Sequence, residues 1–425
     1  MRLWGLWEGG GGMIYRVEVE NFYSVMQSQS LDLRARANLV KKDHLAPLFP
    51  DSCNLVPKVV AVFGANASGK TTVLRAISFV SWFVQHSFGE LPPVADHPPS
   101  GMGFQPCLRF FSDTAKAIPT RICIHFSAPE DLAAPEGSPA AFCQYSYEIR
   151  FEAHLESPRN VLFESLRRWP QKSGKSTRVF ERDKNGKVNG SKEFSLSGYR
   201  NVIDKVRSNA SLISTLVQFN HKPSLRLQEL ATRIFSNILT EKFVFSDEQA
   251  IGLIHGSNPS LLASLNDAIQ RVDLGIKKMT IQSNAQGLSA FFDHEGLNRA
   301  VNIHHESHGT REFIRVYPFL FNALNTGGVA VIDELDQSLH PLLLEEIVRW
   351  FRDEKTNPRN AQLWMTCQSP SLLENLKKEE IIFCEKDESG RTSVYALTDI
   401  KGVRTIANFR KEYLGGVYGA VPKIG

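Results

Sequence analysis

The eight residues 64–71 constrain the fold of this chain more than any other stretch. They read Gly-Ala-Asn-Ala-Ser-Gly-Lys-Thr and match GxxxxGK[ST], the pattern of a phosphate-binding P-loop. The apolar residues 59–63 before them predict a buried parallel strand, and residues 72–84, which contain neither Gly nor Pro, predict a buried helix. A glycine loop between a strand and a helix directs backbone N–H groups at phosphate oxygens. The stretch therefore predicts a nucleotide site.

The residues of this loop have expected roles at the nucleotide. Lys70 should reach the β- and γ-phosphates of ATP, and the Thr71 hydroxyl should ligate Mg²⁺. ATP and Mg²⁺ are thus the cofactors that the motif predicts. The residues expected to contact the nucleotide are Gly64, Ala65, Asn66, Ala67, Ser68, Gly69, Lys70, Thr71 and Thr72.

A second motif, residues 329–334, supplies the acids that a nucleotide hydrolase needs. Four apolar residues precede Asp333 and Glu334, and an acid at the carboxyl end of a buried parallel strand faces the ligand crevice. We expect Asp333 to hold Mg²⁺ through water and Glu334 to polarise the attacking water as a catalytic residue. The pair predicts an ATPase that converts ATP to ADP and phosphate.

More than half of the chain separates Lys70 from Asp333, so we expect an α/β ATPase head with an inserted β-rich and helical subdomain. The expected parts are a poorly ordered leader at 1–12, the first half of the head at 13–105, a β-rich lobe at 106–200, a helical insertion at 201–275 and the second half of the head at 276–425. The Gly-rich leader resembles a translated ribosome-binding sequence, which makes Met13 the expected natural start. Within the insertion, Leu227, Leu230, Ile234 and Ile238 recur at helical spacing and predict one helix face.

Composition narrows the class of protein. The 425 residues are 42% hydrophobic and 22% charged, as in soluble globular proteins, and the net charge of +4 is too small to indicate nucleic-acid binding by itself. Six cysteines without a CxxC pair predict reduced thiols, and no apolar run is long enough to span a bilayer, so we expect a cytoplasmic protein with no membrane partner. The basic span 172–192 is either a solvated hairpin tip or a contact for nucleic acid or a partner.

Four further short motifs resemble those of the ABC-type ATPase heads in SMC, RecF and OLD proteins. They are Asn21-Phe22-Tyr23-Ser24 (N-F-x-S), Ser307-His308-Gly309-Thr310 (the S-x-G signature), Leu335-Asp336 (the D-loop) and Ser338-Leu339-His340-Pro341 (S-x-H-P). The tail at 413–422 and the stretch Asp273-Leu274-Gly275-Ile276 resemble stand-alone OLD-like ATPases of bacterial abortive-infection loci, namely the AbiL/Rlo group and the ATPase subunit of PARIS systems. The resemblance implies an ABC/SMC-type P-loop head.

The same resemblance implies a head that works in pairs. Ser307 and Gly309 would act on nucleotide bound by a partner subunit, with Asp336 and His340 beside it, so a homo-oligomer of two or more heads is expected. It also implies an ATPase sensor that controls a separately encoded effector, such as a TOPRIM-like nuclease, in response to a DNA or phage-protein trigger. Two alternatives stay open. One is a RecF/SMC-like DNA-repair ATPase that clamps DNA when ATP binds, and the other is a scaffold that barely hydrolyses ATP.

The sequence departs from the family pattern at the switch position. The stretch Thr366-Cys367-Gln368-Ser369-Pro370 has Gln368 where the family usually has His. Glutamine forms hydrogen bonds but cannot take up a proton, so hydrolysis is expected to be slow, with Gln368 as the second catalytic candidate. Gln105 is a weak candidate for the Q-loop glutamine. The histidines at 304–308 are expected to line a polar loop rather than bind metal, and Cys367 is expected to be a core thiol.

Overall fold

The computed structural model describes residues 12–36, 43–89, 107–134, 141–154, 160–238, 247–271, 275–284, 287–337, 339–404 and 407–422. Nearly all of the expected leader, together with Gln105, Ser338 and the pair 273–274, lies outside the described residues. Within them, no helix combines the length and the apolar character needed to cross a bilayer.

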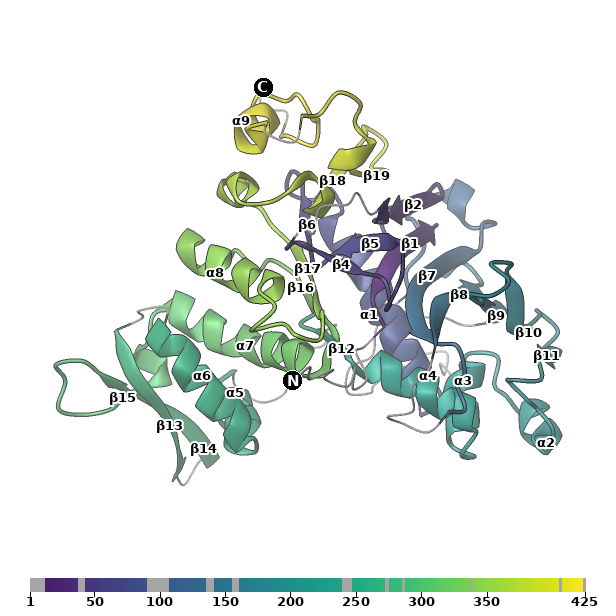
Figure 1. Cartoon of the computed structure of the whole chain (residues 1–425), viewed down its shortest axis with the longest axis horizontal. Coiled ribbons are helices and arrows are strands. Elements are labelled where there is room, and N and C mark those ends of the chain that lie inside the picture. The colour runs from purple at the N-terminus through teal and green to yellow at the C-terminus, as the bar shows by residue number, and fades with distance from the viewer. Residues whose placement is uncertain are drawn as a thin grey trace, which may run out of the picture.

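A six-stranded, mostly parallel sheet carries the P-loop (Figure 1). Its order is β12-β16-β17-β6-β18-β19, with β19 antiparallel to β18 and the other neighbours parallel. The strands are β6 (Val59–Phe63), β12 (Ile234–Ser236), β16 (Val329–Ile332), β17 (Gln362–Thr366), β18 (Ile381–Lys386) and β19 (Thr392–Ala396). Because helices or a second sheet cover both faces, β6, β16 and β17 are buried along their whole length.

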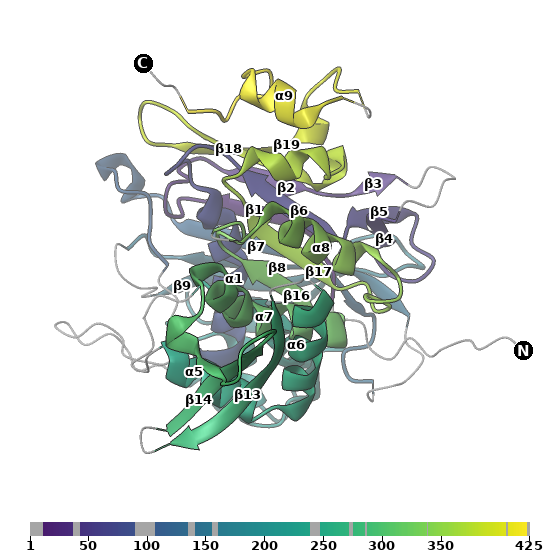
Figure 2. The same ribbon diagram turned by 90° about the vertical axis from the view of Figure 1, so that its left-hand side faces the viewer.

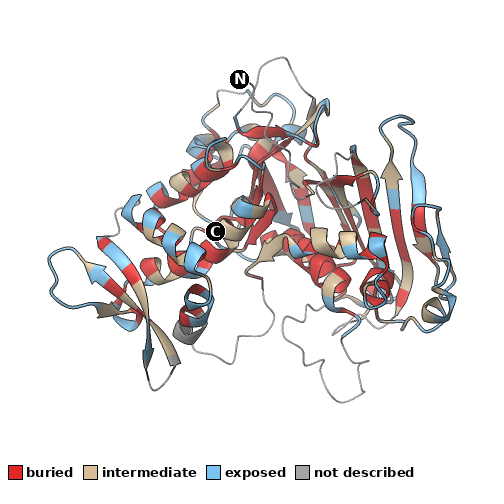
Figure 3. Ribbon diagram, turned by 60° about the horizontal axis from the view of Figure 1, so that its bottom comes forward, coloured by how far each residue is buried: buried red, intermediate tan, exposed pale blue. Residues whose placement is uncertain are grey.

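Alternate residues of the parallel sheet contribute to two separate cores. Val60 and Val62 of β6 pack with helix α1 (Lys70–His86) and a second, antiparallel sheet, whereas Val59 and Ala61 pack with helices α7 (His308–Thr326) and α8 (Pro341–Arg352). This alternation follows the two-residue period of a strand. Figure 3 shows the buried residues concentrated along the central sheet and the helices that touch it.

The antiparallel sheet joins chain segments from both sides of the P-loop. Its order is β11-β10-β9-β8-β7-β1-β2, so the first two strands of the chain pair with the strands of the β-rich lobe. The strands are β1 (Ile14–Glu20), β2 (Gln29–Asp32), β7 (Thr120–Pro129), β8 (Phe142–Phe151), β9 (Val161–Trp169), β10 (Thr177–Arg182) and β11 (Val188–Gly190). The sheet packs its apolar face on α1, and the structure confirms an α/β head with an inserted β-rich and helical part.

The remaining elements surround this head. Helices α3 (Leu212–Val217) and α4 (Lys222–Thr232) lie beside α1, and α2 (Arg200–Ile203) contacts α3 near the outer end of the antiparallel sheet (Figure 1). Helices α5 (Asp247–Gly256) and α6 (Pro259–Arg271) extend from α7 together with β13–β15 (Figures 1 and 2). The remaining strands are β3 (Ala35–Arg36), β4 (Leu45–Pro47), β5 (Asn54–Pro57), β13 (Ile276–Asn284), β14 (Gly287–His294) and β15 (Val301–Asn302). Helix α9 (Phe409–Leu414) covers the edge formed by β18 and β19 (Figure 2).

One predicted helix face was wrong. Leu227 and Leu230 belong to α4, but that helix ends at Thr232, and Ile234 begins β12 instead of continuing the helix. Residues 234–236 pair in parallel with residues 329–331 of β16. The hydrogen bonds of the sheet edge therefore override the helical spacing of the apolar residues, a common way for tertiary structure to overrule a local pattern.

Candidate nucleotide site

The P-loop follows a tight backbone path between β6 and α1. Gly64 has a φ of 154° and Gly69 a φ of 100°, in the region that favours glycine. A Cβ on Gly64 would lie 2.3 Å from the Cys384 carbonyl oxygen, and a Cβ on Gly69 would lie 2.3 Å from Thr392 Oγ1. Strands β18 and β19 therefore press directly against the loop and leave no room for a side chain at either glycine.

Lys70 begins α1, and its ammonium group turns back into the loop. Its Nζ donates hydrogen bonds to the carbonyl oxygens of Gly64 at 2.9 Å and Ala65 at 3.0 Å. The amino-terminal end of the 17-residue helix α1 adds its partial positive charge to that of the lysine. The combination of backbone N–H groups, a helix terminus and a buried ammonium group is suited to a phosphate chain.

The predicted metal ligands lie side by side. Thr71 Oγ1 donates a hydrogen bond to Asp333 Oδ1 at 3.1 Å, and Thr366 Oγ1 donates to the same oxygen at 2.7 Å. Hydroxyl and carboxylate oxygens are the ligands that Mg²⁺ prefers, with water and phosphate completing its octahedron. Thr71 and Asp333 thus fit a magnesium ion bound beside a nucleotide.

The backbone of Asp333 is held by a residue that the sequence analysis did not identify. The Asp333 N–H donates to Asn237 Oδ1 at 2.8 Å, and Asn237 Nδ2 donates to the Asp333 carbonyl oxygen at 3.1 Å. The Asn237 side chain thus adds two hydrogen bonds to β16 just beyond the last backbone pair of β12 and β16. A lone asparagine after a three-residue strand has no spacing pattern, so only the fold shows its role.

Glu334 has a strained backbone conformation and lies next to the end of β17, the strand that precedes Gln368. Its φ is 54°, in the left-handed region that non-glycine residues seldom adopt, and its N–H donates to Thr366 Oγ1 at 2.7 Å. Gln368 Nε2 donates to Glu334 Oε1 at 3.0 Å, which places the two predicted catalytic side chains in contact. Asp336 accepts the backbone N–H groups of Gln368 and Ser369, so it fixes the switch loop.

The N-F-x-S motif supports the P-loop from the other side. Ser24 Oγ lies 3.1 Å from Thr72 Oγ1 and accepts a hydrogen bond from Thr392 Oγ1 at 2.8 Å. Thr392 Oγ1 also lies 2.8 Å from the Ser68 carbonyl oxygen, so one hydroxyl contacts both the loop and Ser24. Asn21 Oδ1 accepts the N–H of Phe110, which brings the segment after the first helix to the site.

A cleft of about 720 Å³ opens over the P-loop. This volume lies within the usual range for small-molecule sites. Its wall combines P-loop residues, both catalytic candidates and aromatic and cationic side chains from three other segments. It is lined by Tyr23, Ser24, Asn66, Ala67, Ser68, Gly69, Lys70, Thr71, Thr72, Arg75, Phe110, Phe111, Glu334, Thr366, Gln368, Lys386, Ser389 and Gly390.

Seven predicted site residues do not line this cleft; Gly64, Ala65, Asp333 and Asp336 adjoin residues that do, whereas Ser307, Gly309 and His340 belong to other helix starts. Ser307 caps the start of α7, where its Oγ accepts the Thr310 N–H at 3.1 Å, and Gly309 follows in the first turn. His340 caps the start of α8 and accepts the Leu342 N–H. Ser307 and His340 are exposed, so one chain by itself does not apply its signature loop to its own P-loop cleft.

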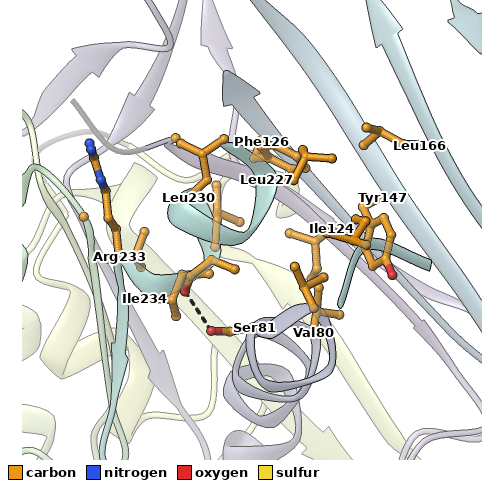
Figure 4. Close-up of a pocket in the computed structure, with 17 residues that line it drawn as sticks. Val80, Ser81, Ile124, Phe126, Tyr147, Leu166, Leu227, Leu230, Arg233 and Ile234 are labelled. Atoms are coloured by element: carbon orange, nitrogen blue, oxygen red, sulfur yellow. Dashed lines mark hydrogen bonds between the residues drawn. The ribbon is translucent and has the colours of Figure 1, made fainter. Parts of the chain in front are cut away.

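A second cavity, of about 70 Å³, lies beneath the middle of α1 and is unrelated to the phosphate site (Figure 4). Val80 of α1, Ile124 of β7 and Leu227 of α4 form part of its apolar wall. Ser81 Oγ, at its edge, is already bonded to the Ala231 carbonyl oxygen at 2.9 Å. The cavity is too small for a nucleotide, and its nearly apolar lining offers few hydrogen-bond partners to ordered water.

Glu18, Cys123 and His125 offer metal-ligand atoms close together on the antiparallel sheet. His125 Nε2 lies 3.0 Å from Glu18 Oε1, but Arg16 and Arg121 also bind this carboxylate, at 2.7 and 2.8 Å. Two guanidinium groups would repel a cation there, so the group is an ion-pair network rather than a metal site.

Two further predictions from the sequence concern Cys367 and the basic span 172–192. Burial raises the pKa of the Cys367 thiol well above its usual value, as expected of a core thiol without an activating base. Lys172 and Lys175 are exposed in the connection between β9 and β10, and neither lines the P-loop cleft. Both readings of the basic span therefore stay open.

Comparison with known proteins identifies one family. A family model described as an AAA domain, putative AbiEii toxin, Type IV TA system, matches residues 59–374. No curated protein matches the chain. Solved structures that resemble it include an SMC head bound to the C-winged helix domain of ScpA, at 13% identity and a TM-score of 0.47, covering 91% of this chain and 99% of that chain. The SMC head domain from Thermotoga maritima has 14% identity and a TM-score of 0.37, covering 90% and 98%.

Proposed function

Because this chain belongs to the AAA-domain family described as putative AbiEii toxin, Type IV TA system, we propose that it is an ATP-dependent regulatory subunit of an anti-phage abortive-infection system. As a member of that family it is an ATPase of the P-loop class. The finer proposal is a sensor or scaffold of the AbiL/Rlo or PARIS type. It would control a separately encoded effector, such as a TOPRIM-like nuclease, through ATP-dependent oligomerisation in the cytoplasm.

One hydrogen-bonded chain carries the proposed ATPase chemistry. It runs from Thr71 of the P-loop through Asp333 and Thr366 to the backbone of Glu334. Thr71 and Asp333 would hold Mg²⁺, which when bound neutralises charge on the β- and γ-phosphates. The network ties the phosphate-binding loop to the residue that would polarise the attacking water.

Glu334 is the proposed general base, and Gln368 is its positioning partner. The Gln368 amide donates to Glu334 Oε1 and leaves Oε2 for a water proton. Because an amide cannot accept that proton in turn, only Glu334 can take it up. We therefore expect slow turnover and a long-lived ATP-bound state.

The exposed signature loop supports action between subunits. Ser307 and Gly309 lie at the start of the 19-residue helix α7, whose N-terminus favours an anion. They lie outside the cleft of their own chain. In the proposed assembly, the signature loop of each chain contacts the triphosphate bound in the P-loop of its partner. ATP binding therefore favours association of the two chains, and association favours ATP binding.

A second candidate function is a DNA clamp of the RecF/SMC type. The exposed lysines of the span 172–192 support it, because phosphate backbones are bound by such side chains. It differs from the first candidate in its macromolecular partner rather than in its ATP chemistry.

One experiment distinguishes these functions. The tagged wild-type chain and Lys70→Ala are recovered from native host extract with ATP, and copurifying proteins are identified by mass spectrometry. The sensor proposal predicts that one protein of the effector type, such as a nuclease, copurifies in different amounts with the wild type and with Lys70→Ala. Salt-sensitive binding of duplex DNA by the wild type, without such a protein, would instead support the clamp. In the same preparations calorimetry should show ATP binding to the wild type and none to Lys70→Ala, and retained binding by the variant would contradict the P-loop assignment.

A further inference from the structure

The carboxyl-terminal tail, residues 409–422, packs against the back of the P-loop. Its contact is a direct hydrogen bond in which the Ala65 N–H donates to the Ala420 carbonyl oxygen at 3.0 Å. Ala65 is the first residue after Gly64 in the loop. The ATPase chemistry described above does not use this tail, although it reaches the loop from more than 340 residues away in sequence.

Ala420 makes this contact in a conformation that alanine seldom adopts. Its φ is 58°, and the residue is buried. Such a conformation costs on the order of 1–3 kcal/mol and persists where surrounding contacts fix it. Here a second donor does so, because Tyr413 OH also bonds the Ala420 carbonyl oxygen at 3.1 Å.

An aromatic cluster fastens the tail to the strand that leads into the P-loop. Phe63 is the last residue of β6, and its ring lies 6.5 Å from that of Tyr413. The ring of Phe383 in β18 stacks on Tyr413 at 5.3 Å and on Tyr418 at 5.8 Å. The Tyr418 carbonyl oxygen accepts a hydrogen bond from Tyr395 OH at 2.7 Å. The tail is therefore held on the same two strands that shape the loop.

The two polar groups of Ala65 are divided between the tail and the phosphate-binding lysine. Its N–H is bonded to Ala420, and its carbonyl oxygen accepts Lys70 Nζ at 3.0 Å together with the Ser68 N–H of the loop at 3.2 Å. We infer that the tail is a positioning element of the nucleotide site: by holding Ala65, it keeps the loop open in the geometry that lets Lys70 and the loop N–H groups receive phosphate. This inference rests on the proposed ATP site and adds a regulatory input to it.

The same contact makes the tail responsive to the nucleotide. If docking of the tail strengthens ATP binding by some factor, ATP must strengthen docking of the tail by the same factor. The turn at 414–417 carries Leu414 and Val417, which are 58% and 65% exposed. Neither side chain takes part in the Ala65–Ala420 hydrogen bond, through which nucleotide in the P-loop is expected to stabilise the docked tail.

Substitutions at Ala420 separate positioning from simple folding. Ala420→Val should weaken ATP binding at least about fivefold, the low end of typical coupling, because a β-branched residue strongly disfavours this backbone conformation. Ala420→Gly adopts it freely and should keep the wild-type affinity. Val417→Ser is the matched control, on the same tail but exposed, and should also bind ATP like the wild type. Affinities are measured by calorimetry with a non-hydrolysable ATP analogue.

Hydrogen exchange on the wild-type chain tests the inference without any variant. Saturating analogue should raise the protection of amides in 409–422 as well as in the P-loop. A wild-type chain that binds the analogue while the tail exchanges unchanged, or an Ala420→Val variant that binds it as tightly as Ala420→Gly, overturns the inference and leaves the proposed ATPase intact. A wild-type chain that binds no nucleotide overturns both.

Discussion

Thr366 shows how much of the site depends on a single buried hydroxyl. Its Oγ1 donates to Asp333 and accepts the backbone N–H of Glu334, each at 2.7 Å. The residue is buried at the base of the cleft, so the loss of either bond should be costly. One side chain from β17 thereby sets the position of both the proposed metal ligand, Asp333, and the proposed general base, Glu334.

Thr366→Val is expected to lower kcat for ATP hydrolysis by at least about tenfold, equivalent to ~1.4 kcal/mol in the barrier. Loss of the hydroxyl leaves the partly buried N–H of Glu334 without this partner, which should also cost about 1 kcal/mol of unfolding free energy. Steady-state kinetics and urea unfolding measure the two effects. Thr366→Ser keeps the hydroxyl and should stay close to wild type. Equal kcat for the valine and serine variants would refute the role.

At the scale of elements, ion pairs between side chains join strands β1 and β7 of the antiparallel sheet. Glu18 of β1 lies between His125 and Arg121 of β7, at 3.0 and 2.8 Å. The hydrogen bond from His125, followed by that from Arg121, lowers the pKa of Glu18 from 4.5 to about 2, although burial acts in the opposite direction. The carboxylate is therefore bound in its charged form in the folded sheet.

This shift predicts a specific acid sensitivity. Because the folded pKa of Glu18 lies below its unfolded value, its stabilisation is fully present above about pH 5 and is lost as the pH falls through 4.5 towards 2. We expect a loss of about 1–2 kcal/mol, less than the full shift implies, since solvent screens part of the network. Glu18→Gln should flatten this part of the profile in urea unfolding between pH 6 and 3. The exposed Glu388→Gln is the control, and an unchanged slope in Glu18→Gln would contradict the assignment.

The elements that could be predicted from the sequence are those whose own residues determine their structure. Buried parallel strands are apolar runs, so β6 and β16 could be located, and the P-loop motif fixed the start of α1. Asn237, Thr392 and Ala420 could not be found, because each acts through a partner distant in the sequence. The end of α4 was misplaced for the same reason, since a partner strand determines where β12 begins.

At the scale of the whole molecule, the proposed mechanism needs two chains to complete one site. The P-loop cleft contains both catalytic candidates, whereas Ser307 is exposed and Gly309 is half-buried, both outside that cleft. A second copy would supply them. The proposed control of an effector depends on this pairing, because the effector can respond to ATP only if the assembly that it binds forms in the presence of ATP.

Mixing two inactive variants tests whether the loop acts between chains. Lys70→Ala lacks a phosphate-binding lysine but keeps its signature loop, and Ser307→Arg has the opposite defect. Each alone should hydrolyse ATP at least about tenfold more slowly than the wild type, and the mixture should recover part of the rate in a phosphate-release assay. Ser260→Arg, at an exposed serine near the start of α6, is the matched control and should remain active. A mixture no faster than its components would count against sharing of sites.

The most direct measurement is the mass of Glu334→Gln in solution, with and without ATP, by light scattering coupled to size-exclusion chromatography. This variant should bind ATP but not hydrolyse it. The account predicts that ATP converts it to a dimer or larger assembly, and that adding Lys70→Ala to the same chain abolishes the shift. Bound ATP, shown by calorimetry, together with an unchanged mass of 47.7 kDa would contradict the central claim that two chains close around the nucleotide.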